Sequence, residues 1–94
     1  MLFAIHMIDR PGAESLRAEL SAAHLGFVGP QLDTMYAGGP LLADDGETII
    51  GSLIIKDFAD RDEAEAWISD EPYTKGGLFE SVTIRAFRAV AGPS

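Results

Sequence analysis

The sequence predicts one α+β domain with the ferredoxin-like order strand, helix, strand, strand, helix, strand. Short runs rich in β-branched and aromatic residues predict the strands, and apolar residues at helical spacing predict the helices. Glycine, proline and aspartate clusters separate these segments. The chain has 94 residues, the length of a single domain. We therefore expect residues 1–94 to form one domain, with residues 91–94 as a disordered tail.

The charge balance argues against nucleic acid and membranes as partners. The chain carries 15 Asp and Glu against 7 Lys and Arg, a formal net charge of -8 that repels phosphate backbones and anionic lipid. No run approaches the ~20 apolar residues of a membrane span. The opening MLFAIHMI is interrupted by Asp9 too soon for a signal peptide. The chain has no cysteine, and we predict a soluble protein of the cytoplasm.

Residues 2–8, LFAIHMI, predict a first strand that is buried on both faces, with His6 as a buried histidine. Pro11 and Gly12 lead into the first helix, which is expected to end near residue 30. The predicted core stripe of this helix consists of Leu16, Leu20, Ala23 and Phe27. His24 lies just outside the stripe, where an imidazole is both oriented and accessible.

Residues 32–43 and 48–58 predict two strands that pair as an antiparallel hairpin, because only the acidic turn between them connects them. Gly38-Gly39-Pro40 is expected to interrupt the first of these strands. Glycines in a strand favour a bulge or a close approach by another backbone or a ligand.

Asp60 predicts the N-cap of the second helix, with Glu63 in the capping-box position. Ala64, Trp67 and Ile68 form its predicted inward face. Pro72 is expected to end this helix by about Asp70 and to leave a tight loop, followed by a flexible stretch over residues 74–77. Residues 78–90 predict the last strand.

The pattern also predicts a homodimer. Two helices cover only one face of a four-stranded sheet, yet the strands at residues 2–8 and 48–58 are apolar on both faces. A second copy of the same sheet, packed face to face by two-fold symmetry, would cover the other face.

Several segments together resemble the YciI-like (YCII-related) family over essentially the whole chain. These segments are MLFAIHMIDRPG, AAHL, GGP, GSL and DEPYTKGGLFESVTIRAF, of which DEPYTKGGLF and AAHL are the most specific. The resemblance implies a dimeric α+β barrel, which agrees with the predicted homodimer. Some relatives look like small-molecule lyases that remove chloride from chlorinated hydroxyquinones, and muconolactone isomerase shares the wider fold.

The resemblance implies a site at His24 with a carboxylate from the loop before the Pro-Tyr pair. The family usually has Asp directly before the proline, whereas this chain has Glu71 there and Asp70 one position earlier. The family also tends to have Arg one turn before the histidine, where this chain has Ser21, with Arg17 a further turn back.

A carboxylate that orients an imidazole fixes its tautomer and raises its basicity. We therefore predict His24 as a general base, with Asp70 or Glu71 as the residue that orients it. Ser52 is a predicted hydrogen-bond donor to substrate, and the other predicted substrate contacts are Gly39 and Arg17.

These residues support more than one hypothesis. The first is a lyase-like or isomerase-like enzyme acting on a small cyclic or aromatic oxygenated molecule. The alternative is a non-catalytic module that binds a small ligand or a partner protein in the same cleft, and a third hypothesis gives His24 a structural role only. His6, Asp9, His24 and Asp70 lack the spacing of a preformed metal site, and no metal or cofactor is predicted.

Overall fold

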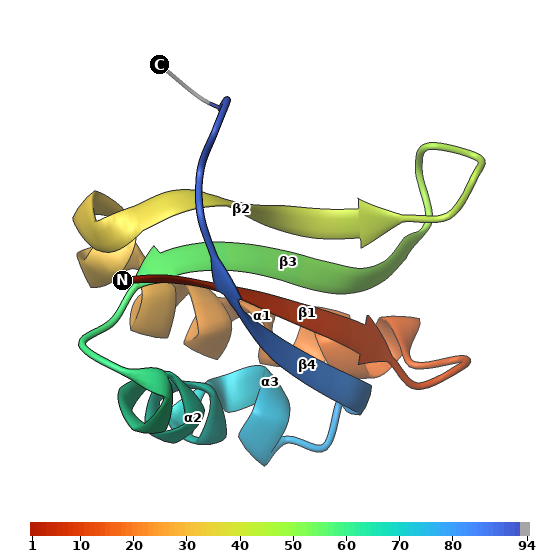
Figure 1. Ribbon diagram of the computed structural model, residues 1–94. Coiled ribbons are helices and arrows are strands. Elements are labelled where there is room, and N and C mark those ends of the chain that lie inside the picture. Colours follow the sequence, from red (N-terminus) through yellow and green to blue (C-terminus); the bar gives the residue numbers. More distant parts are fainter. Residues whose placement is uncertain (93–94) are drawn as a thin grey trace.

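The computed structural model describes residues 1–92, which form a sheet with helices on one of its faces (Figure 1). The elements are β1 (Leu2–Asp9), α1 (Glu14–Val28), the 3₁₀ helix η1 (Gly29–Thr34), β2 (Met35–Leu42), β3 (Ile49–Asp57), α2 (Arg61–Asp70), α3 (Pro72–Lys75) and β4 (Phe79–Phe87). The predicted tail lies partly outside the described residues, because these end at residue 92.

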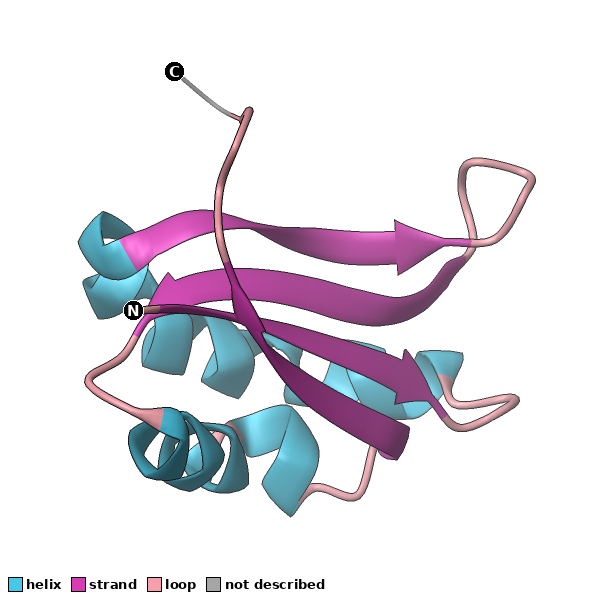
Figure 2. Ribbon diagram, viewed as in Figure 1, coloured by secondary structure: helices cyan, strands magenta, loops and turns pink. Residues whose placement is uncertain are grey.

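The four strands form one antiparallel sheet in the order β2-β3-β1-β4. β1 is central, and its Ile5 pairs with Ile54 of β3 on one side and with Ile84 of β4 on the other. This is the ferredoxin-like arrangement, and the predicted antiparallel hairpin of β2 and β3 is confirmed. Figure 2 shows that the helices gather on one side of the sheet and leave the other side without a helix.

The core lies between the sheet and the helices. Phe3, Ile5 and Met7 of β1 are buried there, together with Ile54, Phe58, Ala64, Ile68 and Ile84. His6 lies between them in sequence and is exposed in the single chain, which therefore does not bury it as predicted. Alternate residues of a strand point to opposite faces, and His6 therefore lies on the face that has no helices.

The predicted core stripe of α1 holds in part. Leu16, Leu20 and Phe27 are partly buried, but Ala23 is exposed, whereas Val28 is buried and Arg17, Ser21 and His24 are partly buried as well. The inward face is wider than predicted because the prediction ranked positions by hydrophobicity alone. Polar side chains can face inward where other groups of the protein satisfy their hydrogen bonds, and both Arg17 and His24 have such partners.

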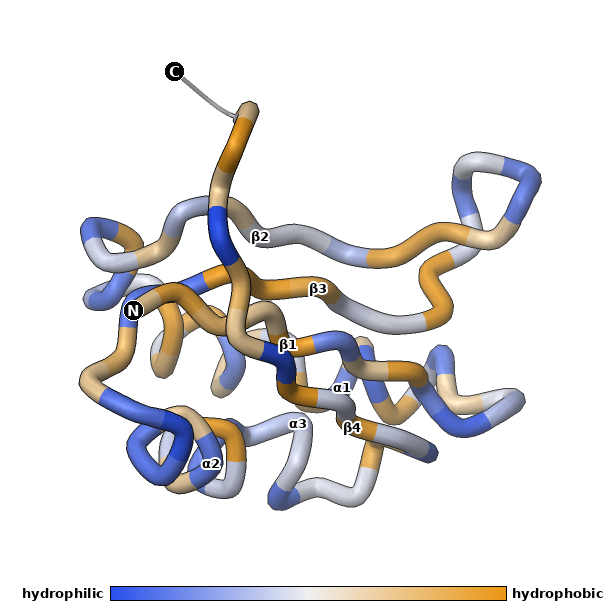
Figure 3. Tube along the Cα trace, in the orientation of Figure 1, coloured by the Kyte–Doolittle hydropathy of each residue, from blue (hydrophilic) through white to orange (hydrophobic). Residues whose placement is uncertain are grey.

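The ends of α2 follow the sequence prediction. The Asp60 carboxylate accepts a hydrogen bond from the backbone N–H of Glu63 (2.9 Å), and the Glu63 carboxylate accepts one from the N–H of Ala59 (2.7 Å). Figure 3 shows the hydrophilic stretch that runs from the end of β3 into α2. The inward face of α2 is also confirmed, since Ala64 and Ile68 are buried and Trp67 packs against the core.

The predicted loop after α2 contains the short helix α3 instead. Proline favours the first position of a helix, and Pro72 lies there. The side chain of Glu71 caps α3, because its carboxylate accepts a hydrogen bond from the backbone N–H of Tyr73 (3.0 Å). This cap fixes Glu71 and Tyr73 relative to each other.

The strand β2 runs without a break through Gly38-Gly39-Pro40, so the predicted interruption was wrong. Its irregularities lie near its two ends, at Met35/Ala37 and Leu41/Leu42. The close backbone approach occurs at Gly51 of β3, where a Cβ atom would lie 2.1 Å from the carbonyl oxygen of Met7. Gly51 thus lets β3 lie close to β1 immediately before Ser52.

None of the helices within residues 1–92 has the length and apolar character needed to cross a membrane.

Candidate functional site

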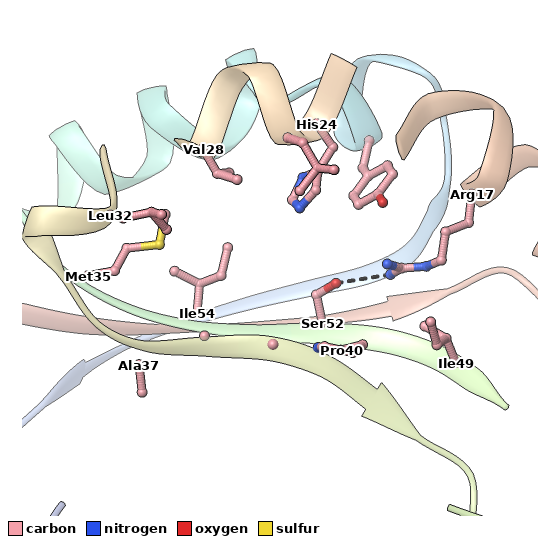
Figure 4. Close-up of a pocket in the computed structure, with 14 residues that line it drawn as sticks. Arg17, His24, Val28, Leu32, Met35, Ala37, Pro40, Ile49, Ser52 and Ile54 are labelled. Carbon is pink, nitrogen blue, oxygen red and sulfur yellow. Dashed lines mark hydrogen bonds between the residues drawn. The ribbon is translucent and has the colours of Figure 1, made fainter. Parts of the chain in front are cut away.

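A cavity of about 520 Å³ lies between α1 and the sheet. Its walls come from α1, η1, β2 and β3, with Tyr73 of α3 (Figure 4). His24, Tyr73, Arg17 and Ser52 line this cavity, and Glu71 and Asp9 contact residues that line it.

His24 extends from α1 into this cavity and binds a buried carboxylate. Its Nδ1 lies 2.6 Å from Oε1 of Glu71, whose side chain is only 1% exposed. The other carboxylate oxygen of Glu71 accepts the Tyr73 N–H, so both oxygens are held in place. In a neutral imidazole that donates from Nδ1, Nε2 carries the lone pair. The arrangement therefore presents a basic nitrogen at a fixed position.

Tyr73 packs against both His24 and Arg17. Its ring is stacked on the His24 imidazole, with ring centroids 4.1 Å apart and planes inclined by 15°. The guanidinium carbon of Arg17 lies 4.7 Å from the centroid of the same ring. Burial raises the pKa of Tyr73, and the nearby Glu71 charge raises it further against the opposing effect of Arg17. The Tyr73 hydroxyl is therefore protonated at neutral pH.

Arg17 forms a bidentate ion pair with Asp9. Its Nε and Nη2 lie 2.7 and 2.9 Å from the two carboxylate oxygens, and both side chains are largely buried. Burial lowers the pKa of Arg17, but the hydrogen bond and the charge of Asp9 outweigh it, and the net shift is upward. Arg17 is thus a permanent cation.

Ser52 completes the polar wall. Its Oγ accepts a hydrogen bond from Nη2 of Arg17 at 2.9 Å, drawn as the dashed line in Figure 4. Because the oxygen accepts from Arg17, the hydroxyl hydrogen of Ser52 is directed elsewhere and is available to donate. Ser52 is itself buried and lines the cavity.

The structure separates the two candidate carboxylates. Glu71 contacts His24, whereas the side chain of Asp70 is 71% exposed and lies 3.9 Å from Nζ of Lys75. The other predicted residues, Arg17, Gly39 and Ser52, all line the cavity with His24. Glu71 does not line the cavity itself but contacts His24, which does, whereas Asp70 does neither.

The sequence prediction did not assign Asp9 and Tyr73 to the site. Asp9 had been weighed only as a metal ligand, and its pairing with Arg17 depends on how β1 and α1 pack. Tyr73 had a signal in the sequence, because it belongs to the closing segment that carries the family resemblance. Within residues 1–92, no group of three or more His, Cys, Asp or Glu side chains is placed to hold a metal ion.

The fold and the site together define a ferredoxin-like α+β domain with a histidine–carboxylate pair at a cavity between helix and sheet. Residues 1–88 match the model of the YCII-related domain, and the chain belongs to this family. It is 28% identical to protein YciI of Escherichia coli and of Shigella flexneri, over 96% of this chain and 99% of each relative.

Solved structures agree with this assignment. The chain is similar to the 5-chloro-2-hydroxyhydroquinone dehydrochlorinase TftG of Burkholderia phenoliruptrix AC1100, whose structure is a complex with 2,5-dihydroxybenzoquinone. The TM-score is 0.87 and the identity 33%, covering 94% of each chain. Protein Atu4242 of Agrobacterium tumefaciens has the same fold at 15% identity, with a TM-score of 0.54 over 99% of this chain and 98% of its own.

Proposed function

We propose that this protein is an enzyme of the lyase or isomerase type that removes a proton from a small cyclic oxygenated molecule. His24 acts as the general base and Glu71 orients it. One observation carries the proposal, the 2.6 Å contact between Nδ1 of His24 and a carboxylate that is almost fully buried. A base needs a fixed tautomer and a place for the positive charge that it acquires, and this contact supplies both.

The proton goes to Nε2 of His24, because Nδ1 already donates to Glu71. The imidazolium that forms is stabilised by the adjacent carboxylate. The electron pair left by the proton moves into a new double bond of the substrate. In a lyase reaction the leaving group then departs as an anion with its bonding pair, and in an isomerase reaction His24 returns the proton at another carbon.

The negative charge that develops on a substrate oxygen is stabilised by the opposite wall. Ser52 donates its hydroxyl hydrogen, and the Arg17 cation supplies a positive field close to it. Such groups are effective because they are oriented before the reaction and lie in a partly buried site of low dielectric. Gly39 lines the cavity through its backbone, because its pairing partner Leu53 lies on the helix-free face of the sheet.

The comparison with TftG supports the substrate class. That protein is named as a dehydrochlorinase of a chlorinated hydroxyhydroquinone, and the molecule bound to it is an oxygenated six-membered ring. At 33% identity and a TM-score of 0.87, related chemistry on a related ring is the most economical proposal for this chain. Fold similarity alone would not support it, because one fold hosts many functions.

Release of chloride from 5-chloro-2-hydroxyhydroquinone tests the proposal. We expect turnover by the parent and a loss of about 10²- to 10⁴-fold in kcat for His24→Gln, the usual contribution of a general base. Asp70→Asn is the matched control, because it removes an exposed carboxylate next to Glu71, and its rate should equal that of the parent. A parent that binds the ring without turnover, across related hydroxyquinones, would favour the non-catalytic module instead.

We also propose that the protein acts as a homodimer through the face of the sheet that has no helices, and that it is located in the cytoplasm. Leu53 and Ile55 of β3 are only partly buried on that face, beside Ala4 and His6 of β1. A second copy would bury these side chains. Sedimentation at micromolar concentration should give the mass of two chains, and the mass of one chain would contradict the proposal.

A further inference from the structure

The cavity has two chemically different ends, which Figure 4 shows on either side of His24. Arg17 and Ser52 lie at one end and supply polar groups. The other end is formed by Val28, Leu32, Met35 and Ile54. None of these four side chains has a group that forms a conventional hydrogen bond. The polar chemistry of the site is therefore confined to one part of the cavity.

The cavity is larger than one oxygenated ring requires. An apolar cavity of about 150 Å³ is sufficient to hold benzene. The cavity of about 520 Å³ in this protein falls in the range of about 300–1,000 Å³ in which larger organic ligands bind. A ring that contacts His24 and Ser52 would fill the polar end and leave the apolar end empty.

The apolar end also exposes a large side chain. Val28 and Ile54 are 7% and 6% exposed and form its inner wall, whereas Leu32 is 63% exposed although it lines the cavity too. Apolar surface in contact with water is unfavourable, and its removal from water stabilises a complex roughly in proportion to the area covered. An apolar ligand group at this end would cover part of it.

We propose that the natural substrate carries an apolar substituent of several carbon atoms on its oxygenated ring, and that Val28, Leu32 and Met35 select for it. This inference rests on the proposed function, because it takes the ring to lie at His24 and Ser52. The substituent extends from the ring toward η1, along the apolar wall. The substrate is then an alkylated or arylated hydroxyquinone or hydroquinone rather than the bare ring.

Binding of hydroquinone and its 2-methyl, 2-propyl, 2-pentyl and 2-heptyl derivatives, measured by calorimetry, tests the inference. We expect Kd to fall by up to about fourfold for each added methylene until the apolar end is filled, because each buried methylene contributes a near-constant transfer free energy. A Kd that does not fall with chain length would overturn the inference.

Variants test where the substituent lies. Val28→Phe should remove the dependence of Kd on chain length. Val82→Phe is the matched control, since Val82 lies on β4 and is 39% exposed outside the cavity, and it should keep the full dependence. If Val28→Phe does not fold, Leu32→Asp serves instead, because that side chain is already exposed. Full chain-length dependence in the folded variant would overturn the placement.

The two proposals fail separately. Chloride release that depends on His24, together with a Kd that is constant along the series, leaves the proposed function standing and removes this inference. A Kd that falls along the series, without any turnover, removes the proposed enzyme and leaves an apolar binding end in the cavity.

Discussion

Two buried carboxylates each hold a nitrogen-containing side chain at the cavity, and the two pairs differ in what they allow. Asp9 holds Arg17 through two short hydrogen bonds, and Arg17 cannot lose its proton at any ordinary pH. Glu71 holds His24 through one hydrogen bond, which leaves the second ring nitrogen for another partner. Both pairs contain a carboxylate and a base of nearly the same burial. The first pair is suited to fixing a charge, and the second is suited to moving a proton.

The largest expected effect is on kcat, and it distinguishes Glu71 from its neighbour Asp70. Glutamine has only one acceptor oxygen, but the site has two donors, Nδ1–H of His24 and the N–H of Tyr73. The amide of Glu71→Gln can also donate to Nδ1, which moves the proton to Nε2 and removes the base. We expect kcat to fall by about 10²- to 10⁴-fold. Steady-state rates of both variants check this. The rate of Asp70→Asn should match that of the parent.

Equal rates for Glu71→Gln and the parent would show that the second pair does not move a proton. The contrast between the two pairs would then have no functional meaning.

The second effect concerns the pair that fixes a charge. Asp9→Asn leaves the Arg17 cation without a full counter-charge in a largely buried position, and we expect a loss of about 3–5 kcal/mol in the free energy of unfolding. The double variant Asp9→Leu/Arg17→Met should regain most of this loss, because the uncompensated charge is absent. Denaturant unfolding measures both. If Asp9→Asn is as stable as the parent, the role assigned to the pair of Asp9 and Arg17 is contradicted.

The smallest effect is on stability at alkaline pH. The native pKa of Tyr73 is raised, chiefly by burial, whereas the unfolded chain has the ordinary tyrosine pKa of about 10. The contribution of Tyr73 to stability is therefore complete below that pH and is lost as pH rises through the native pKa. Tyr73→Phe should show a shallower decline in melting temperature above pH 10 than the parent. Identical slopes would contradict the raised pKa.

The order of the elements and much of the site could be predicted from the sequence. These features could be predicted because they depend on local interactions. Asp60 and Glu63 cap α2 through neighbours in sequence, and the short acidic turn after β2 leaves the hairpin no other pairing. These features depend on residues a few positions apart. The apolar periodicity that predicts strands and helices is local in the same sense.

The rest depends on packing between distant segments. The prediction for α1 missed the polar part of its inward face, because these residues find partners 8 and 47 positions away, Asp9 for Arg17 and Glu71 for His24. The choice between Asp70 and Glu71 is likewise made by the geometry of α2 and α3, which turns one carboxylate outward and the other inward. Apolar periodicity does not distinguish these two adjacent acidic residues, whereas the family resemblance places the carboxylate directly before the proline, which is the position of Glu71.

Exchange of the ring protons of 2,5-dihydroxybenzoquinone with deuterium oxide, followed by NMR, tests the general base most directly. A deuteron adds to a ring carbon and the base removes the proton from that carbon, and no leaving group is needed. We predict that the parent and Asp70→Asn accelerate the exchange, and that His24→Gln binds the ring without accelerating it. Exchange at the same rate with the parent and with His24→Gln, while the ring is bound to both, would contradict the account.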